Sequence, residues 1–257
     1  MDVMHARLAL RERSTLDVLD LSVRFVSAHK AIYLRAMAPV IAPAFFASWA
    51  FAHVAGWAWG WLGAVLLSLP SQAPFTALAS RLVFDDRVRA RDALTSSLRA
   101  MPRLVLARAL QLLALGLALA FFVVPSLWVA GATLFLGEVV LLEQSTVGRS
   151  FGRAQRIAAT DVGSAIFGVA LVVVLPLAAA VLADITGRAV LEDLLEVRAP
   201  APLWRDGGSW LALLGFWAAV PFAATVRFLA YVNFRTRSEG WDIQTRFAAL
   251  ATRGPLE

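Results

Sequence analysis

Long uncharged stretches alternate with short arginine-rich segments along the chain. Residues 36–80 contain no Asp, Glu, Lys or Arg. As one α-helix this stretch would be roughly 68 Å long, about twice the ~30 Å hydrocarbon core of a bilayer, so it must fold back once. The segment 56–61 is Gly-Trp-Ala-Trp-Gly-Trp, which combines flexible Gly with Trp, the residue that favours the membrane–water boundary. The pattern predicts two membrane-spanning helices joined by a turn at this segment.

The same pattern predicts four more spans. Pro125 interrupts a second apolar block and is best placed at the start of a new helix. Two further uncharged stretches cover residues 162–183 and 207–226, each long enough to cross a bilayer. The predicted fold class is therefore all-α, a polytopic transmembrane helical bundle of six spans within residues 31–235. The predicted spans are 31–55, 58–80, 103–124, 126–146, 162–184 and 208–235.

Three segments outside these spans predict short amphipathic helices along the membrane surface. In the N-terminal segment 1–30, one helical stripe carries apolar residues, and Ser14 or Thr15 is a suitable N-cap. A second, more polar surface helix is predicted over 84–100, and a third within the loop 185–207, before Pro200. The apolar stripe of the first helix consists of Leu16, Leu19, Val23 and Val26.

The distribution of basic residues predicts the orientation. Cytoplasmic flanks of membrane helices retain Arg and Lys. Of the 24 basic residues, 21 lie in the segments 1–35, 81–108, 149–156 and 227–253, whereas the loop 185–207 is net negative. We therefore expect this loop outside, and the N-terminal segment and the C-terminal tail 236–257 in the cytoplasm. The first 30 residues mix basic and acidic side chains without an apolar core, so no signal peptide is expected.

Composition supports a membrane protein. The chain is 60% hydrophobic and only 16% charged, which excludes disorder and argues against a soluble globular domain. Cys is absent, which excludes disulfides, thiolate metal sites and Cys nucleophiles. The net charge of +6 suits phosphate-rich lipid surfaces better than nucleic acid. We expect membrane lipids as partners and no nucleic acid.

The sequence offers little for catalysis. Gly148-Arg149-Ser150-Phe151-Gly152 matches the GxSxG pattern of hydrolase nucleophiles, but it lies in a basic connection rather than a strand–turn–helix. The residues His5, His29 and His53 have no metal-binding spacing. We therefore predict no catalytic residue, no metal and no cofactor.

Polar residues within the spans are the stronger candidates for a site. Arg108 and Glu138 lie at similar depth on consecutive predicted helices, and an unpaired charge in the core costs about 2.5–3.5 kcal/mol, so a contact between them is predicted. Together with Gln72 they form a candidate intramembrane polar site. The alternatives are an ion pair that locks the hairpin, an Arg that reaches to the surface, and a substrate or headgroup site. Glu143 is expected to meet Arg149 or another basic residue.

Proline residues form a second candidate in the first two spans. Pro39 and Pro43 are expected at depths similar to those of Pro74 and Pro70, so two kinked helices would meet near the middle of the membrane. Broken helices at this depth bind substrate in many transporters, but Pro kinks are also ordinary packing devices. Ser71 and Gln72 are positioned to bond carbonyls that the prolines leave without donors.

Two stretches together resemble a known family. One contains Leu142-Glu143 and Arg149-Ser150-Phe151-Gly152-Arg153-Ala154; the other runs from Tyr231 to Asp242, YVNFRTRSEGWD. They resemble bacterial multi-pass proteins of the glycerophosphoryl diester phosphodiesterase membrane domain-like family, which often end in Tyr-x-Asp-x-Arg-x-Arg-x-Glu-Gly-x-Asp. This chain has Asn233 where Asp is usual and Gln244 where an acid often follows. It also lacks the catalytic domain that some members carry, so the resemblance implies a subunit of an envelope complex rather than an enzyme.

The C-terminal motif also has a direct physical interpretation. Arg235 and Arg237 suit lipid phosphates, Trp241 suits the interface, and Asp242 can cap a short surface helix. These residues and Glu239 either anchor the chain or dock a partner.

We expect a non-enzymatic integral subunit or scaffold of a bacterial cell-envelope complex. It is expected in the cytoplasmic membrane, with other membrane or membrane-associated subunits as partners. The alternatives are a transporter for a lipid or anionic solute and, with less support, a membrane hydrolase.

Overall fold

The computed structural model describes residues 13–85 and 88–240, and all regular structure among them is helical. Besides α-helices, it contains one π-helical turn, η2 (Val190–Leu194). In chain order the α-helices are α1 (Thr15–Ala28), α2 (Lys30–Ala55), α3 (Trp57–Ser71), α4 (Ala73–Phe84), α5 (Ala90–Phe121), α6 (Val123–Ala132), α7 (Leu136–Leu142), α8 (Val147–Ala158), α9 (Val162–Ala189), α10 (Leu203–Asp206) and α11 (Trp210–Glu239).

Six helical segments are long and apolar enough to cross a membrane. This confirms the predicted all-α, multi-pass fold with six spans, and the protein is a membrane-embedded helical protein. The segments are Lys30–Ala55, Trp57–Phe84, Ala90–Phe121, Val123–Leu142, Val162–Leu194 and Trp210–Glu239.

Two of these segments are broken rather than straight. The second divides into α3 and α4 at Gln72, because Pro74 lacks a backbone N–H and is placed in the first turn of a new helix. The fourth divides into α6 and α7 at residues 133–135. Of the other predicted kink positions, Pro39 and Pro43 lie inside α2 and Pro70 inside α3. The hydroxyl of Ser71 donates to the carbonyl of Leu67 at 2.7 Å.

Two other helices are longer than expected. The prediction of a separate surface helix over 84–100 is wrong from residue 90 onward. Residues 90–100 belong to α5, which continues through Pro102 to Phe121. A proline removes only one hydrogen bond of the ladder, and a long helix tolerates that loss. Similarly, α9 and η2 extend to Leu194, into the loop expected at 185–207. Arg188 supports this extension by pairing with Glu192 at 3.1 Å.

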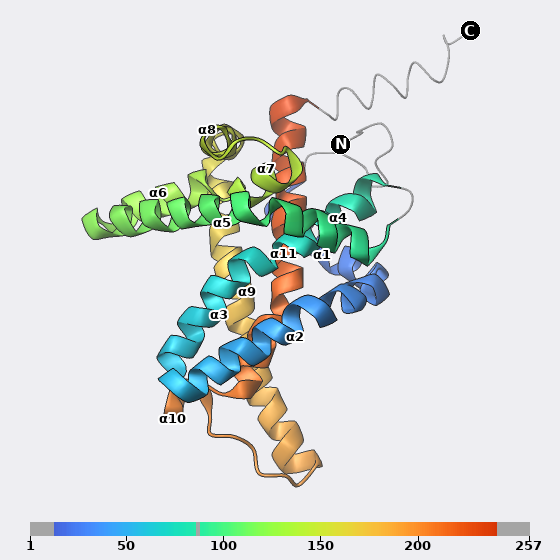
Figure 1. Ribbon diagram of the computed structural model, residues 1–257, viewed down its shortest axis with the longest axis vertical. Helices are drawn as coiled ribbons and strands as arrows, with labels where there is room; N and C mark the ends of the chain where they lie inside the picture. Colours follow the sequence, from blue (N-terminus) through green and yellow to red (C-terminus); the bar gives the residue numbers. More distant parts are fainter. Residues whose placement is uncertain (1–12, 86–87, 241–257) are drawn as a thin grey trace.

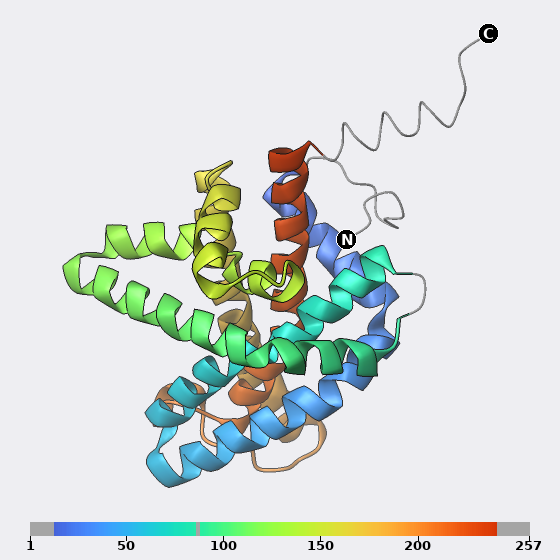
Figure 2. The ribbon, with the colours of Figure 1, turned by 45° about the horizontal axis from the view of Figure 1, so that its top comes forward.

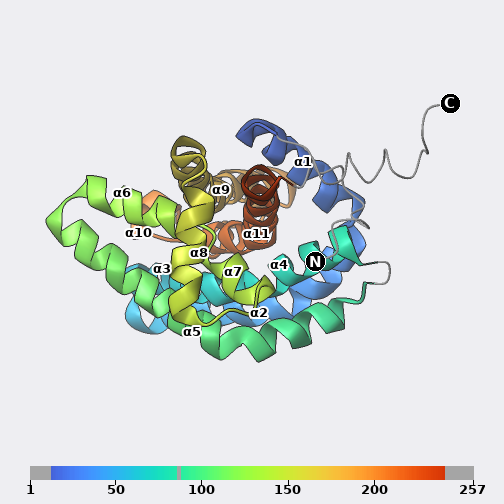
Figure 3. The same cartoon turned by 90° about the horizontal axis from the view of Figure 1, so that it is seen from above.

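Helix α11 is the centre of the molecule. In its apolar stretch of 18 residues, 83% of the residues are buried inside the protein, compared with 22% in the corresponding stretch of α5. It packs against α1, α2, α3, α4, α8 and α9, and Figure 3 shows it surrounded by several of these helices. The approach of α9 and α11 is close at Gly215, where a Cβ atom would lie 2.3 Å from the carbonyl oxygen of Ala179. Only glycine fits at this position.

Two helical hairpins extend away from this centre. Figures 1 and 2 show α5 and α6 projecting to one side of α9 and α11, with α2 and α3 forming a second arm below them. Large apolar side chains are exposed along both arms, as expected for helices surrounded by lipid. The end of the molecule at which α8 and the C-terminal end of α11 lie is called the α8 face here.

Helix α1 begins at the predicted cap, since Ser14 and Asp17 form a capping box. Val18 and Phe25 face the protein, where α1 packs on α11. Leu16 and Val23 of the predicted apolar stripe are exposed. Leu16 and Val23 are therefore free to contact lipid, whereas Val26 of the same stripe packs against the protein core.

Candidate functional site

Four polar side chains follow one another at intervals of four residues along α11. They are Arg227, Tyr231, Arg235 and Glu239. Residues four apart lie on the same face of an α-helix, so these side chains form one continuous stripe. The stripe meets acidic and basic side chains from α7, from Glu143 directly after α7, and from α8.

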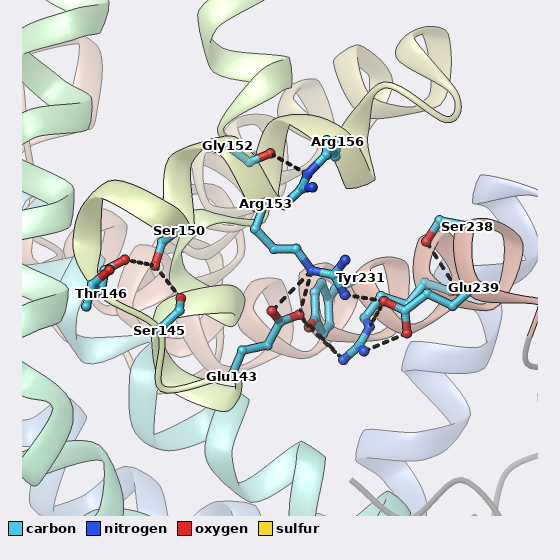
Figure 4. A network of polar contacts seen from close by, with 11 residues as sticks. Glu143, Ser145, Thr146, Ser150, Gly152, Arg153, Arg156, Tyr231, Ser238 and Glu239 are labelled. Atoms are coloured by element: carbon cyan, nitrogen blue, oxygen red, sulfur yellow. Dashed lines mark hydrogen bonds and ion pairs between the residues drawn. The ribbon is translucent and has the colours of Figure 1, made fainter.

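The outer part of the stripe forms a closed set of contacts, called the α11 network here and drawn in Figure 4. Its members are Glu143, Arg153, Tyr231, Arg235 and Glu239. Arg153 of α8 donates to Glu143 at 3.2 Å and also to Glu239. Arg235 donates to Glu239 at 2.6 Å and to the Tyr231 hydroxyl at 3.1 Å. That hydroxyl donates to Glu143 at 2.8 Å, which completes the circuit.

The α11 network is electrically balanced, with two arginines and two glutamates. Burial acts to lower the pKa of Arg153, but the charges of Glu143 and Glu239 outweigh it and hold that pKa above its ordinary value. Each carboxylate accepts charge-assisted hydrogen bonds from two different helices. The network therefore fixes α8 and the end of α7 against α11.

Another face of α11 holds the N-terminal segment and the start of α9. Arg237 pairs with Asp161 at 2.9 Å and donates to the backbone carbonyl of Arg13 at 2.7 Å. The amide of Asn233 makes two further bonds to the Arg13 backbone, at 2.9 and 3.0 Å. Asp161 caps α9 through Ser164. These hydrogen bonds from Ser164, and then the charge of Arg237, lower the pKa of Asp161 below its usual range.

Deeper along the stripe, Glu138 of α7 is fully buried and pairs with Arg227 at 2.6 Å. This corrects the predicted Arg108–Glu138 contact. The charges of Arg108 and Glu138 are close enough to interact, and a Cβ atom on the adjacent Gly137 would be 2.6 Å from Arg108 Nη2. Nevertheless, Arg108 donates to Gln111 at 2.6 Å, and Gln111 in turn donates to Thr133. Arg227 pairs with the Glu138 carboxylate because α11 presents a guanidinium directly to it. Helix α5, which belongs to the preceding span, does not.

The buried cluster has unequal charge. Two guanidiniums, Arg108 and Arg227, accompany the single carboxylate of Glu138. Within the described residues, Arg108 Nε and Glu138 Oε2 have no hydrogen-bond partner. Gln72, the third predicted member, is buried at the α3–α4 break, and no hydrogen bond joins it to Arg108 or Glu138 in the described part of the chain. The structure thus brings together two of the three predicted residues.

The hydrolase-like motif lies at the start of α8. Ser150 is fully buried, and its hydroxyl bonds to Ser145 at 2.7 Å and to the Thr146 carbonyl at 3.0 Å. None of the hydrogen bonds of Ser150 in the described residues involves a histidine, the usual base for such a nucleophile. The described residues also contain no group of three or more His, Asp or Glu side chains suited to a metal ion.

The C-terminal candidates divide into two groups. Arg235, Arg237 and Glu239 all have ion-pair partners within the chain, so the positions proposed for lipid or partner contact also hold the helices together. Trp241 and Asp242 lie outside the described residues. Gly240 ends α11 in a left-handed conformation with φ +63°, which favours glycine.

Sequence reasoning missed Arg227 as the partner of Glu138 and Asp161 as the partner of Arg237. The four-residue spacing of Arg227, Tyr231, Arg235 and Glu239 was the available signal. Such a stripe on an apolar helix indicates one polar face, and Glu138 and Glu143 offer carboxylates to that face.

Comparison of the chain with protein-family models, curated proteins and solved structures gives no match. The resemblance to the glycerophosphoryl diester phosphodiesterase membrane domain-like family therefore stays a prediction from the residues quoted above.

Proposed function

We propose that this protein is a non-enzymatic subunit or scaffold of a complex associated with the bacterial cell envelope. The α11 network carries the proposal. Its arginines and glutamates are committed to one another, and they join three helical segments into a fixed unit. Because these charged groups pair with one another, they are not available to a substrate. A fixed surface of this kind is better suited to supporting other proteins than to catalysing a reaction.

We place the protein in the cytoplasmic membrane with the α8 face inside, because basic residues concentrate at that end. Helix α8 then presents Arg149 and Arg156, both exposed, to cytoplasmic partners, while its third arginine, Arg153, holds it in place. Other membrane or membrane-associated subunits, and the lipids around the two hairpin arms, are the partners of this proposal.

The test is purification of the tagged protein in mild detergent and in nanodiscs, with mass spectrometry of what co-purifies. Three chains are compared: the wild type, Arg149→Gln/Arg156→Gln on α8, and Arg198→Gln/Arg205→Gln in the loop at the opposite end. Both double variants remove two exposed positive charges. We expect stoichiometric protein partners with the wild type and the loop variant, and their loss from the α8 variant. Purification of the wild type alone in both media would contradict the proposal.

A second candidate is transport of a lipid or anionic solute, favoured by the surroundings of Arg108. This side chain lines an apolar groove of about 190 Å³ between α3 and α5. Fluorescent phosphatidylglycerol in proteoliposomes provides the probe. A transporter accelerates its movement between leaflets, and Arg108→Leu abolishes that acceleration. A scaffold leaves the rate at that of protein-free liposomes.

A further inference from the structure

A second group of arginines lies on the α8 face, around a cavity of about 430 Å³. The cavity lies between α4, α5 and the connection from α7 to α8. Its wall has more polar than apolar surface, and the polar side chains come from three segments that are far apart in the sequence. These are Ser80, Arg81, Ser96, Arg99, Arg103 and Gln144.

No acidic side chain of the described residues neutralises the positive charge of this cavity. No Asp or Glu is among the described residues that line it. Among the described residues, Arg81, Arg99 and Arg103 take part in no ion pair, and the one side-chain bond they make runs from Arg103 to the Gln144 carbonyl at 3.3 Å. The nearby Glu143 is already occupied by Arg153 and Arg235. Three guanidiniums therefore face one space to which the described residues contribute no counter-charge.

The backbone at the edge of the cavity is strained. Gln144 has φ +50°, a left-handed conformation that non-glycine residues rarely adopt. In this conformation its carbonyl accepts the bond from Arg103, which holds that side chain at the cavity. Strain of this kind is retained where the surrounding structure requires a particular geometry, and it clusters at binding sites.

The chemistry of the wall indicates its ligand. Guanidinium groups bind phosphate oxygens through paired, charge-assisted hydrogen bonds. The Ser80 hydroxyl, in the wall of the cavity, adds a neutral donor. The volume of about 430 Å³ leaves room for more than an inorganic phosphate. A phosphate with a further group attached therefore fits better than an inorganic ion.

The position of the cavity favours a lipid as the source of this phosphate. Leu141 and Leu142 form part of its wall, and Leu142 is also the last residue of the Val123–Leu142 membrane-spanning segment. Ser80 and Arg81 likewise lie in the last turn of α4, where the Trp57–Phe84 segment ends. Ends of spans lie at the level of lipid headgroups. We propose that this cavity binds the phosphate of an anionic phospholipid.

The test uses the purified, delipidated full-length chain and native mass spectrometry. Phosphatidylglycerol and phosphatidylcholine with the same acyl chains are titrated separately, and inorganic phosphate and glycerol 3-phosphate are titrated by calorimetry. Arg99→Gln/Arg103→Gln removes two charges from the cavity, and Arg149→Gln/Arg156→Gln removes two from α8 on the same face. If the cavity variant fails to fold, Arg99→Gln alone replaces it, because Arg99 is exposed.

We expect the wild type to bind phosphatidylglycerol in preference to phosphatidylcholine. The cavity variant should raise the Kd for phosphatidylglycerol about tenfold or more, because two charge-assisted contacts are lost. The α8 variant should leave that Kd within about twofold, the size of a weak surface effect.

Two results would overturn the proposal. An equal loss of binding in both variants would assign the preference to general surface charge. Binding of glycerol 3-phosphate or inorganic phosphate that depends on Arg99 and Arg103, without a preference between the two lipids, would assign the cavity to a soluble phosphate. Neither result bears on the subunit proposal, which depends on protein partners.

Discussion

Two groups of arginines lie on the same face of this protein and have opposite surroundings. In the α11 network, Arg153 and Arg235 each contact two glutamates. Around the cavity between α4 and α5, Arg81, Arg99 and Arg103 contact no carboxylate among the described residues. The residue type and the position relative to the membrane are similar, so the difference lies in the acidic partners.

This difference separates arginines that hold the fold from arginines that remain available. A guanidinium between two carboxylates has its donors occupied, and its removal leaves buried or half-buried acids without partners. A guanidinium that faces a cavity costs the fold little when it is removed. Charge alone therefore does not separate the two groups of arginines in this protein, whereas the pairing state of each arginine does.

The largest effect is expected where a paired arginine becomes unpaired in the membrane. Glu138→Leu leaves Arg108 and Arg227 together without a carboxylate and should lower the free energy of unfolding by about 3–5 kcal/mol. Unfolding in detergent, followed by fluorescence of the nine tryptophans, measures this. Arg227→Leu should cost less, because the charge of Arg108 is close enough to Glu138 to replace the lost partner. Equal losses in both variants would show that Arg108 does not respond to Glu138.

A smaller effect is expected in the α11 network itself. Arg153→Ala removes the side chain that joins Glu143 to Glu239, and the free energy of unfolding should fall by about 1–2 kcal/mol. Arg149→Ala, one turn earlier on α8, is the matched control and should change it by no more than about 0.5 kcal/mol. The same loss in both variants would mean that pairing contributes nothing to stability.

The ion pair between Asp161 and Arg237 should show its contribution through pH. Asp161→Asn should lower the free energy of unfolding by about 0.5–1 kcal/mol at pH 7, since solvent screens this partly exposed pair. The folded-state pKa of Asp161 lies below its unfolded value, so its stabilisation is fully present above about pH 4 and is lost as the pH falls through the folded pKa. Melting temperatures of both proteins from pH 7 to pH 3 should therefore converge at the acidic end. A constant difference would exclude ionisation as the cause.

The smallest change in stability is expected in the cavity. Without lipid, Arg99→Gln should leave the free energy of unfolding within about 0.5 kcal/mol of the wild type, because Arg99 is exposed and none of the described acidic residues pairs with it. Addition of phosphatidylglycerol should then raise the melting temperature of the wild type more than that of the variant. A clear loss of stability without lipid would place Arg99 among the structural arginines.

The sequence predicted the six spans because helix length, bilayer thickness and uncharged runs are local properties of the chain. It also predicted the cap at Ser14 from a residue type with a strong conformational preference. The break at Gln72 lies between the predicted kink positions Pro70 and Pro74. The break at residues 133–135 was missed, since no proline or charged residue marks it in the sequence.

The candidate site could be predicted only in part. Sequence placed Arg108 and Glu138 at the same depth, and their charges are close enough to interact. It did not give the rotation of each helix or the identity of its non-sequential neighbours, so the partnership of Glu138 with Arg227, 89 residues later, was not visible. The cavity arginines were counted only as basic residues. Their convergence depends on the packing of α4, α5 and α7.

The central position of α11 has a consequence for the order in which the contacts of the protein form during synthesis. Among the described spans this helix leaves the ribosome last, yet it packs against α2, α3, α4 and α9 of the first, second and fifth spans. Glu138 therefore enters the membrane before its final partner has been translated, and Arg108, already inserted on α5, is the guanidinium present at that stage. Until α11 arrives, the earlier helices form an incomplete assembly that relies on the insertion machinery and on lipid to cover the groove α11 will fill.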